Sequence, residues 1–388
     1  MKRFQIILYI FLFPVLSGAS TSNQSVVESA RSGLEFKPSA GFLIGSTSNA
    51  TRLGEPTPGY FGKVVPSAGL EYSPSDSFFV IGTLKAELKR FSDPTVGAIA
   101  NETIVDGKAD ISLSIDDSES GTWEVGSHLG LGYTENQIPI VGSQTIQSQR
   151  QQYYQPDIRL YGARIGEAWS LDLGASGSTR RYSTTTFDIQ GNVYKDTFNE
   201  YRADGTIGYR WSKGLRFYLK TVLQRRFYLE RMAEFSDGLP PPQGSPHSKL
   251  VISSGEVEPQ LKSSIRSIPL TSAVSFRAEK DHVYGARDSL RLKVRQNSSI
   301  HLPFSIVFEP EISVARQAFS RFRADPIVDP KNSPLRVDWD LQALAAVTRP
   351  FGKVLSVRAQ YAFNRKISNY TIQNYLEHVV ETGMALQL

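Results

Sequence analysis

The chain of 388 residues has 43 Lys and Arg against 38 Asp and Glu, a formal net charge of +5, and no cysteine. Loss of Lys2 and Arg3 with the leader described below lowers the charge to +3, which is too near neutral to favour a nucleic-acid partner. The lack of cysteine excludes disulfides and excludes lipid attachment at an N-terminal cysteine.

The first residues have the three regions of a secretory signal peptide. Lys2 and Arg3 supply the positive charge, residues 6–16 are apolar, and small residues follow up to Ala19. We therefore predict a signal peptide over residues 1–19, with cleavage after Ala19. Residues 20–32 are polar and rich in serine, which predicts a short periplasmic leader.

Residues 33–388 repeat one unit, in which an alternating segment, a polar loop, a second alternating segment and a tight turn follow one another. The predicted tight turns are 73–77, 116–121, 166–168, 212–214, 263–267, 297–301 and 350–353. The predicted longer loops are 46–58, 92–105, 134–150, 183–196, 229–249, 281–288, 317–333 and 366–374. This strict alternation of short and long connections predicts about sixteen strands (14 to 18).

The predicted strands separate two faces with a period of two residues. Along residues 290–295, leucine and valine alternate with arginine and lysine, and along residues 302–314 one parity is continuously apolar. Although the chain has 17 Tyr, 21 Phe and 4 Trp, no run beyond the signal peptide approaches the roughly 18 apolar residues of a membrane helix. The prediction is an all-β fold, a transmembrane antiparallel up-and-down β-barrel with short periplasmic turns and long extracellular loops.

Both ends of the predicted strands carry signals on the apolar parity. Trp123, Trp169 and Trp211 lie beside short turns, where amphipathic rings favour the membrane interface. At the other end, six of the eight strands that run away from the short turns carry a cation, and none carries an anion. We predict that these cations contact lipopolysaccharide phosphates, the alternative being that the loops simply begin with solvated charges. They are Arg90, Arg181, Arg225, Lys280, Arg316 and Arg365.

The polar parity predicts the lining of a pore, because a barrel of sixteen strands usually encloses an aqueous passage. The predicted pore-lining residues are Lys85, Glu87, Glu124, His128, Arg159, Arg202, Arg210, Arg216, Lys220, Glu256, Glu258, Arg291, Lys293, Arg295, Glu309, Glu311, Asp338, Asp340 and Arg358. Basic segment 215–224 neighbours Glu256 and Glu258, and basic segment 290–295 neighbours Glu309 and Glu311. We therefore expect cross-strand charge pairs and weak charge selectivity.

The last segment, residues 375–388, alternates like the others and carries a terminal pattern. Glu381, Gly383, Leu386 and Leu388 match the closing-strand signal of bacterial outer-membrane β-barrels, although leucines stand where that family usually has aromatics. The chain thus resembles Gram-negative, porin-like outer-membrane β-barrel proteins, and no motif selects a named family. The resemblance implies an integral outer-membrane protein that contacts lipid, lipopolysaccharide and the barrel-assembly machinery.

Three functions remain open from the sequence. A passive diffusion channel for small hydrophilic solutes is favoured. The alternative is an occluded adhesin, receptor or structural barrel acting through loops such as 229–249, which contains four prolines. An outer-membrane enzyme is disfavoured: none of the 5 histidines is followed two residues later by a serine, and adjacent Asp281 and His282 point to opposite sides of a strand. Asp338 and Asp340 are expected to pair with Arg358. We expect no cofactor and no metal site.

Glycines on the polar parity surround one predicted pore-lining histidine. Gly126, Gly130 and Gly132 share the parity of His128. Glycine at such positions favours curvature or close packing more often than the approach of a ligand.

Overall fold

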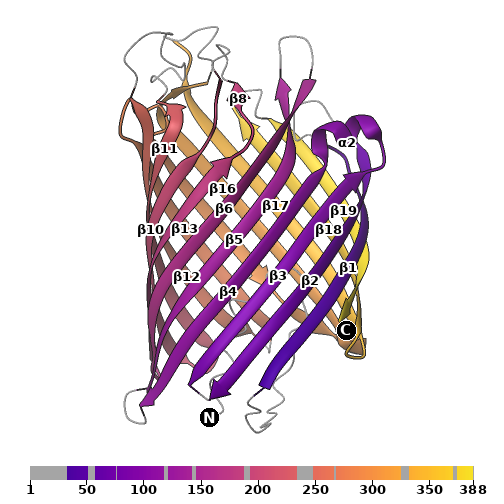
Figure 1. The fold of residues 1–388 in the computed structure, drawn as a ribbon, viewed down its shortest axis with the longest axis vertical. Helices are drawn as coiled ribbons and strands as arrows, with labels where there is room; N and C mark the ends of the chain where they lie inside the picture. The colour runs from indigo at the N-terminus through magenta and orange to yellow at the C-terminus, as the bar shows by residue number, and fades with distance from the viewer. Residues whose placement is uncertain are drawn as a thin grey trace.

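The computed structural model describes residues 33–50, 57–75, 77–117, 121–141, 146–187, 193–233, 248–265, 268–324, 332–369 and 374–387. The predicted signal peptide and leader lie outside these ranges. The described chain forms one antiparallel sheet that closes into a barrel of steeply tilted strands (Figure 1). The elements are β1 Gly33–Thr47, β2 Gly59–Ser75, β3 Phe78–Phe91, α2 Pro94–Ala100, β4 Glu102–Asp117, β5 Gly121–Val141, β6 Ile146–Ile165, β7 Trp169–Tyr182, β8 Thr186–Phe187, β9 Val193–Tyr194, β10 Phe198–Ser212, β11 Leu215–Met232, β12 Lys249–Ile265, β13 Ile268–Asp281, β14 Ser289–Ser298, β15 Ile300–Leu302, the 3₁₀ turn η1 Pro303–Ser305, β16 Ile306–Arg323, β17 Leu335–Phe351, β18 Leu355–Ser368 and β19 Tyr375–Gln387.

The strand count agrees with the sequence prediction. The main sheet contains 17 strands, but β15 begins just after β14 ends and both pair with β16. Together β14 and β15 form one interrupted strand, so 16 strands pass round the closed barrel. The predicted fold class is therefore confirmed. Strands β8 and β9 form a separate small hairpin within a long connection.

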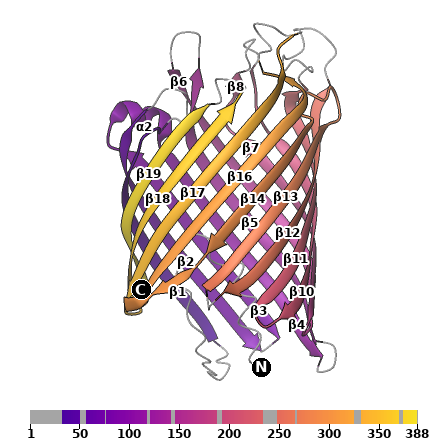
Figure 2. The same ribbon diagram turned by 180° about the vertical axis from the view of Figure 1, so that it is seen from behind.

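The barrel closes where the first strand meets the last. Strand β1 pairs with β2 along its whole length and with β19 from Ser39 opposite Gln387 to Thr47 opposite Val379. Strand β1 begins and β19 ends at the same rim (Figure 2). This rim carries the short connections and is called the short-turn rim, and the opposite one is called the long-loop rim.

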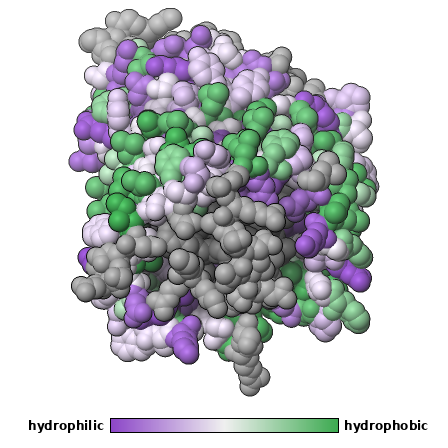
Figure 3. Space-filling view, turned by 60° about the horizontal axis from the view of Figure 1, so that its bottom comes forward, coloured by the Kyte–Doolittle hydropathy of each residue, from purple (hydrophilic) through white to green (hydrophobic). Residues whose placement is uncertain are grey.

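The outer wall of the barrel is apolar. Large side chains of one strand parity are exposed there, among them Ile44, Leu223 and Leu290. Figure 3 shows apolar residues gathered in a band across the outer wall, with hydrophilic residues along the rim beyond it. The tryptophans Trp123, Trp169, Trp211 and Trp339 are all exposed on this parity. Three of them lie by the short turns, as expected.

One predicted turn is wrong by several residues. The sequence analysis placed a reversal at residues 297–301, but the strand continues through β15 and the chain turns at Pro303–Ser305. Proline has no N–H to donate to the neighbouring strand, so strand pairing ends at Pro303 and not at the polar residues before it. Phe304 and Ser305 have positive φ angles of 63° and 59° in this turn.

Two long connections contain more regular structure than expected. Strands β5 and β6 pair as far as Val141 opposite Ile146, so most of the predicted loop 134–150 is a hairpin that projects beyond the rim (Figure 1). The predicted loop 92–105 contains α2, whose first turn is capped because Asp93 accepts a hydrogen bond from Thr95 N at 2.7 Å. Among the described residues, no helix is long and apolar enough to cross a membrane.

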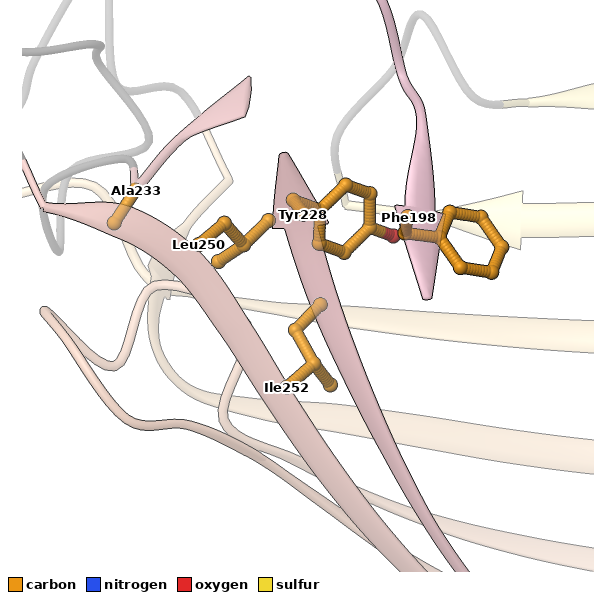
Figure 4. Packing of buried hydrophobic residues seen from close by; sticks show 5 residues of the cluster. All are labelled: Phe198, Tyr228, Ala233, Leu250 and Ile252. Atoms are coloured by element: carbon orange, nitrogen blue, oxygen red, sulfur yellow. The ribbon is translucent and has the colours of Figure 1, made fainter. Parts of the chain in front are cut away.

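Two apolar clusters pack near the long-loop rim. One contains Phe198, Tyr228, Ala233, Leu250 and Ile252 from the ends of β10, β11 and β12, with ring centroids of Phe198 and Tyr228 5.2 Å apart (Figure 4). The other joins Phe61, Phe91, Val379 and Val96 of α2. These clusters lie on opposite sides of the barrel, because about half of the strands separate β2 from β11 in either direction.

Candidate functional site

The polar parity forms the interior face of the barrel. Four ion pairs on this parity bridge strands that are not neighbours, each reaching across an intervening strand. Strands next but one lie roughly 9 to 10 Å apart, so such pairs form where the curvature brings side chains together. These pairs are Arg159–Asp204 across β7, Arg295–Glu258 across β13, Arg291–Asp340 across β16 and Arg358–Glu309 across β17.

The predicted pore-lining residues share this interior face by register. For example, Asp110, His128, Arg159, Ser176 and Arg202 are successive Cα partners on β4, β5, β6, β7 and β10. The other predicted pore-lining residues lie on the same strand parity as these five positions or as the four bridging ion pairs. That they border a water-filled passage remains a prediction.

A bonded network covers the wall formed by β4 to β7 and β10. His128 Nδ1 lies 2.7 Å from Asp110 Oδ1, and its Nε2 lies 3.7 Å from Asp157 Oδ2. Arg159 donates from Nη2 to Asp172 at 2.8 Å and to Asp204 at 2.7 Å. The acids of this wall are therefore held by a few shared cations rather than by one cation each.

Glycines let these side chains lie flat against the wall. A Cβ added to Gly130 would collide with the Asp157 carboxylate, one at Gly126 would meet the Tyr161 ring, and one at Gly174 would meet the Arg159 guanidinium. The glycines beside His128 thus serve close packing of neighbouring side chains, which is the use that the sequence analysis favoured for them.

The predicted partners of several charges are wrong. Glu311 stands opposite Asn297, beyond the basic residues of β14, so the expected contact of Glu309 and Glu311 with residues 290–295 does not form. Asp340 pairs with Arg291 at 3.2 Å, and Glu309 pairs with Arg358 at 3.7 Å. The tilt of the strands shifts each charge along the wall relative to its sequence neighbours, which chain order does not reveal.

Asp338 also has other partners than expected. Its carboxylate accepts from Arg336 at 2.6 Å and from Ser368 Oγ at 2.6 Å, and it lies 3.5 Å from Lys366 Nζ. Arg358, the expected partner, is taken by Glu309. By contrast, Lys220 does stand opposite Glu258, as the order of the strands predicted.

A small polar cavity lies on the interior face between β13, β14 and β16. Its volume is about 180 Å³, and its lining consists of Arg277, Glu279, Ser289, Arg291 and Gln317. Arg277 and Arg291 are direct Cα partners, and each is bound to its own carboxylate, Glu279 for the first and Asp340 for the second. Sequence reasoning missed this cavity, because it depends on the register between β13 and β14. Among the described residues, no group of three or more His, Asp or Glu could hold a metal ion.

The outward cations near the long-loop rim lie on the outer wall. Arg90 donates to Glu102 O at 2.7 Å and to Thr103 Oγ1 at 2.8 Å, which holds its guanidinium against β4. Arg225 stacks over Phe227 and Arg316 over Trp339. Within the described part of the chain, none of Arg90, Arg181, Arg225, Lys280, Arg316 and Arg365 forms an ion pair with a carboxylate.

The terminal pattern falls on the closing strand. Glu381, Gly383 and Leu386 belong to β19, and Leu388 lies outside the described residues. Glu381 is the Cα partner of Gly45, and Gly383 the partner of Leu43. A Cβ at Gly383 would collide with Phe42 O and Leu43 Cα, so this position requires glycine for β1 and β19 to pair.

No protein-family model and no curated protein sequence matches this chain. Among solved structures, OccAB1 of Acinetobacter baumannii has a TM-score of 0.51 at 9% identity, covering 93% of this chain and 100% of that chain. OccAB3 of the same organism has a TM-score of 0.47 at 8% identity (91% and 99% covered), and OprB of Pseudomonas putida has 0.47 at 11% identity (92% and 94% covered). Together with the closed barrel, the first of these likenesses gives the chain the fold of outer-membrane porins.

Proposed function

We propose that the protein is a porin-like channel of the outer membrane, through which small hydrophilic solutes diffuse passively with weak charge selectivity. One observation carries the proposal: a closed barrel of 16 strands has an apolar outer wall and an interior face that carries both signs of charge. Barrels of this size usually enclose an aqueous passage. Outer-membrane barrels have short turns on the periplasmic side, so in the proposed channel the short-turn rim faces the periplasm.

The ion pairs of the interior face support the weak selectivity. Lys63 pairs with Glu87 at 2.9 Å, and Arg159, Arg291 and Arg358 each have carboxylate partners. Paired charges cancel much of their field along the passage, so a permeating ion meets little net charge over most of the wall.

Conductance of the refolded protein in a planar bilayer tests the proposal. We expect discrete open steps, and a reversal potential near zero across a potassium chloride gradient. A large reversal potential would support the proposed channel but contradict the proposed weak charge selectivity. A silent bilayer, with the barrel folded on a heat-modifiability gel, would favour the alternative of an occluded barrel that acts through its loops.

An enzymatic function has less support. His282 Nε2 lies 2.7 Å from Ser253 Oγ, a contact across strands that the sequence analysis did not foresee. A serine nucleophile also needs a group that orients its histidine, and the neighbouring Asp281 carboxylate accepts instead from Val283 N at 2.9 Å. The proposal is therefore a channel without catalytic activity.

We also propose that the six outward cations contact lipopolysaccharide phosphates. Arg225, Ser253 and Lys280 are successive Cα partners on β11, β12 and β13, so two cations flank a hydroxyl on the outer wall. Replacing all six cations by glutamine should reduce the lipopolysaccharide that co-purifies with the barrel several-fold, because charge-assisted hydrogen bonds to phosphate are lost. Unchanged co-purification from a correctly folded variant would leave them as solvated charges.

A further inference from the structure

Three cations oppose one another on the interior face near the short-turn rim. Arg210 of β10 is the Cα partner of Arg216 of β11, and Arg216 is the partner of Lys262 of β12. Side chains at such positions have Cβ atoms roughly 4.5 to 5.5 Å apart, and like charges there repel each other. These three residues are called the basic row.

No carboxylate neutralises the basic row within the described part of the chain. Other interior cations have ion pairs, such as Arg202 with Asp204 and Arg295 with Glu258, but none is formed by a member of the row. On β12 the nearest acid is Glu258, four residues from Lys262 and so about 13 Å along the strand. Lys262 Nζ instead lies 4.8 Å from the ring centroid of Tyr218.

The positions beside the row on β13 and β14 are polar but uncharged. Lys262 stands opposite Thr271 of β13, and Thr271 stands opposite Asn297 of β14. At the other end, Arg210 N donates to Ala168 O in the turn before β7. Hydroxyl and amide groups beside three cations can complete the hydrogen bonding of an oxyanion without competing for its place.

The row cannot reach membrane lipid. Arg216 and Lys262 share the interior parity of Lys220 and Glu258, and Arg210 is the Cα partner of Arg216, so the row lies on the interior face. Trp211, which is 70% exposed on the outer wall, meets Tyr209 edge to face there. An anion that meets the row must therefore come through the interior of the barrel and not from the lipid phosphates.

We propose that the basic row is an anion-binding step of the passage at its periplasmic end, with phosphate or another multivalent oxyanion as its ligand. The three Cα positions span two strand spacings, about 10 Å, which flexible arginine and lysine side chains close round one multivalent group. Arginine binds such oxygens in pairs through its planar fork. This inference rests on the proposed channel and adds a ligand class to it.

Phosphate block of the chloride current tests the proposal. In a planar bilayer with potassium chloride, inorganic phosphate added on the short-turn side at constant ionic strength should lower the current of the unaltered protein in a saturable way. The variant Arg210→Gln/Arg216→Gln/Lys262→Gln should raise the half-blocking concentration at least about tenfold, since the bound phosphate loses its charge-assisted hydrogen bonds.

A matched control removes three cations outside the passage. Arg225→Gln/Arg316→Gln/Arg365→Gln changes the net charge equally but on the outer wall, and its phosphate block should equal that of the unaltered protein. If the interior triple variant does not fold, the single changes Arg210→Gln and Arg216→Gln should each weaken the block part of the way.

The outcomes separate the two proposals. An open channel whose current is insensitive to phosphate, or whose block survives the loss of the basic row, overturns the anion-binding step and leaves the channel intact. A folded barrel without any current overturns the channel itself.

Discussion

Replacing Gly383 by alanine is expected to lower the free energy of unfolding by about 3 kcal/mol, the upper end of the usual cost of overpacking. The added Cβ would meet Phe42 O and Leu43 Cα, which are backbone atoms and cannot turn aside as a side chain can. Relief requires β19 to move away from β1, and these two strands form the seam that closes the barrel. Urea unfolding of the refolded barrel, followed by its heat-modifiable mobility, measures the loss.

Gly62 supplies the matched control for this change. It lies in β2 between Ile44 and Arg90, and a Cβ there would meet no atom within 4 Å. Gly62→Ala should therefore leave stability unchanged or raise it slightly, because alanine restricts the unfolded chain. Equal effects of the two substitutions would contradict the steric argument.

Refolding in detergent also separates two roles of Gly383. If the residue acts only as part of a signal for the assembly machinery, as the terminal pattern implies, Gly383→Ala will fold normally without that machinery and fail only in cells. The steric argument predicts a defect in both settings.

The strand architecture could be predicted because its causes are local. The period of two residues, as in residues 290–295, fixes which side chains face out, and the sorting of short from long connections fixes the number of strands. The short helix α2 was missed even though Asp93, Pro94 and Thr95 form an ordinary helix start. Its place in a polar loop concealed that signal.

The partners across the interior could not be predicted, because they depend on register and curvature. Arg291 reaches Asp340 across β16. A comparison of segments that are adjacent in the sequence does not predict a contact between strands that are not neighbours. The apolar clusters at the long-loop rim were missed for a different reason. Phe61 and Phe91 occupy the polar parity, and only the folded chain brings Val96 of α2 onto them. The interior is thus polar along its wall and apolar where loops pack against it.

Replacing Arg159 by methionine is expected to reduce stability and to make the channel prefer cations. Arg159 is shared by Asp172 and Asp204, whose side chains are 26% and 14% exposed. Removing one partner of a buried pair costs about 3 to 5 kcal/mol, and the partial exposure here lowers the expected loss to about 2 kcal/mol. The two carboxylates then face the passage uncompensated, so the reversal potential in a salt gradient should shift towards the cation value.

Arg202 and Asp204 provide the controls for this prediction. Arg202 lies 3.4 Å from Asp204 but is 44% exposed, so Arg202→Met should cost less than about 1 kcal/mol. Adding Asp204→Asn to Arg159→Met should recover part of the stability and part of the selectivity, because one of the two carboxylates that lost Arg159 is removed. A variant Gly174→Ala, which pushes the guanidinium off the wall, should show a milder form of the same shift. If Arg159→Met and Arg202→Met behave alike, the interior charges act as a diffuse set, and the bonded network of β6, β7 and β10 has no special part in either stability or permeation.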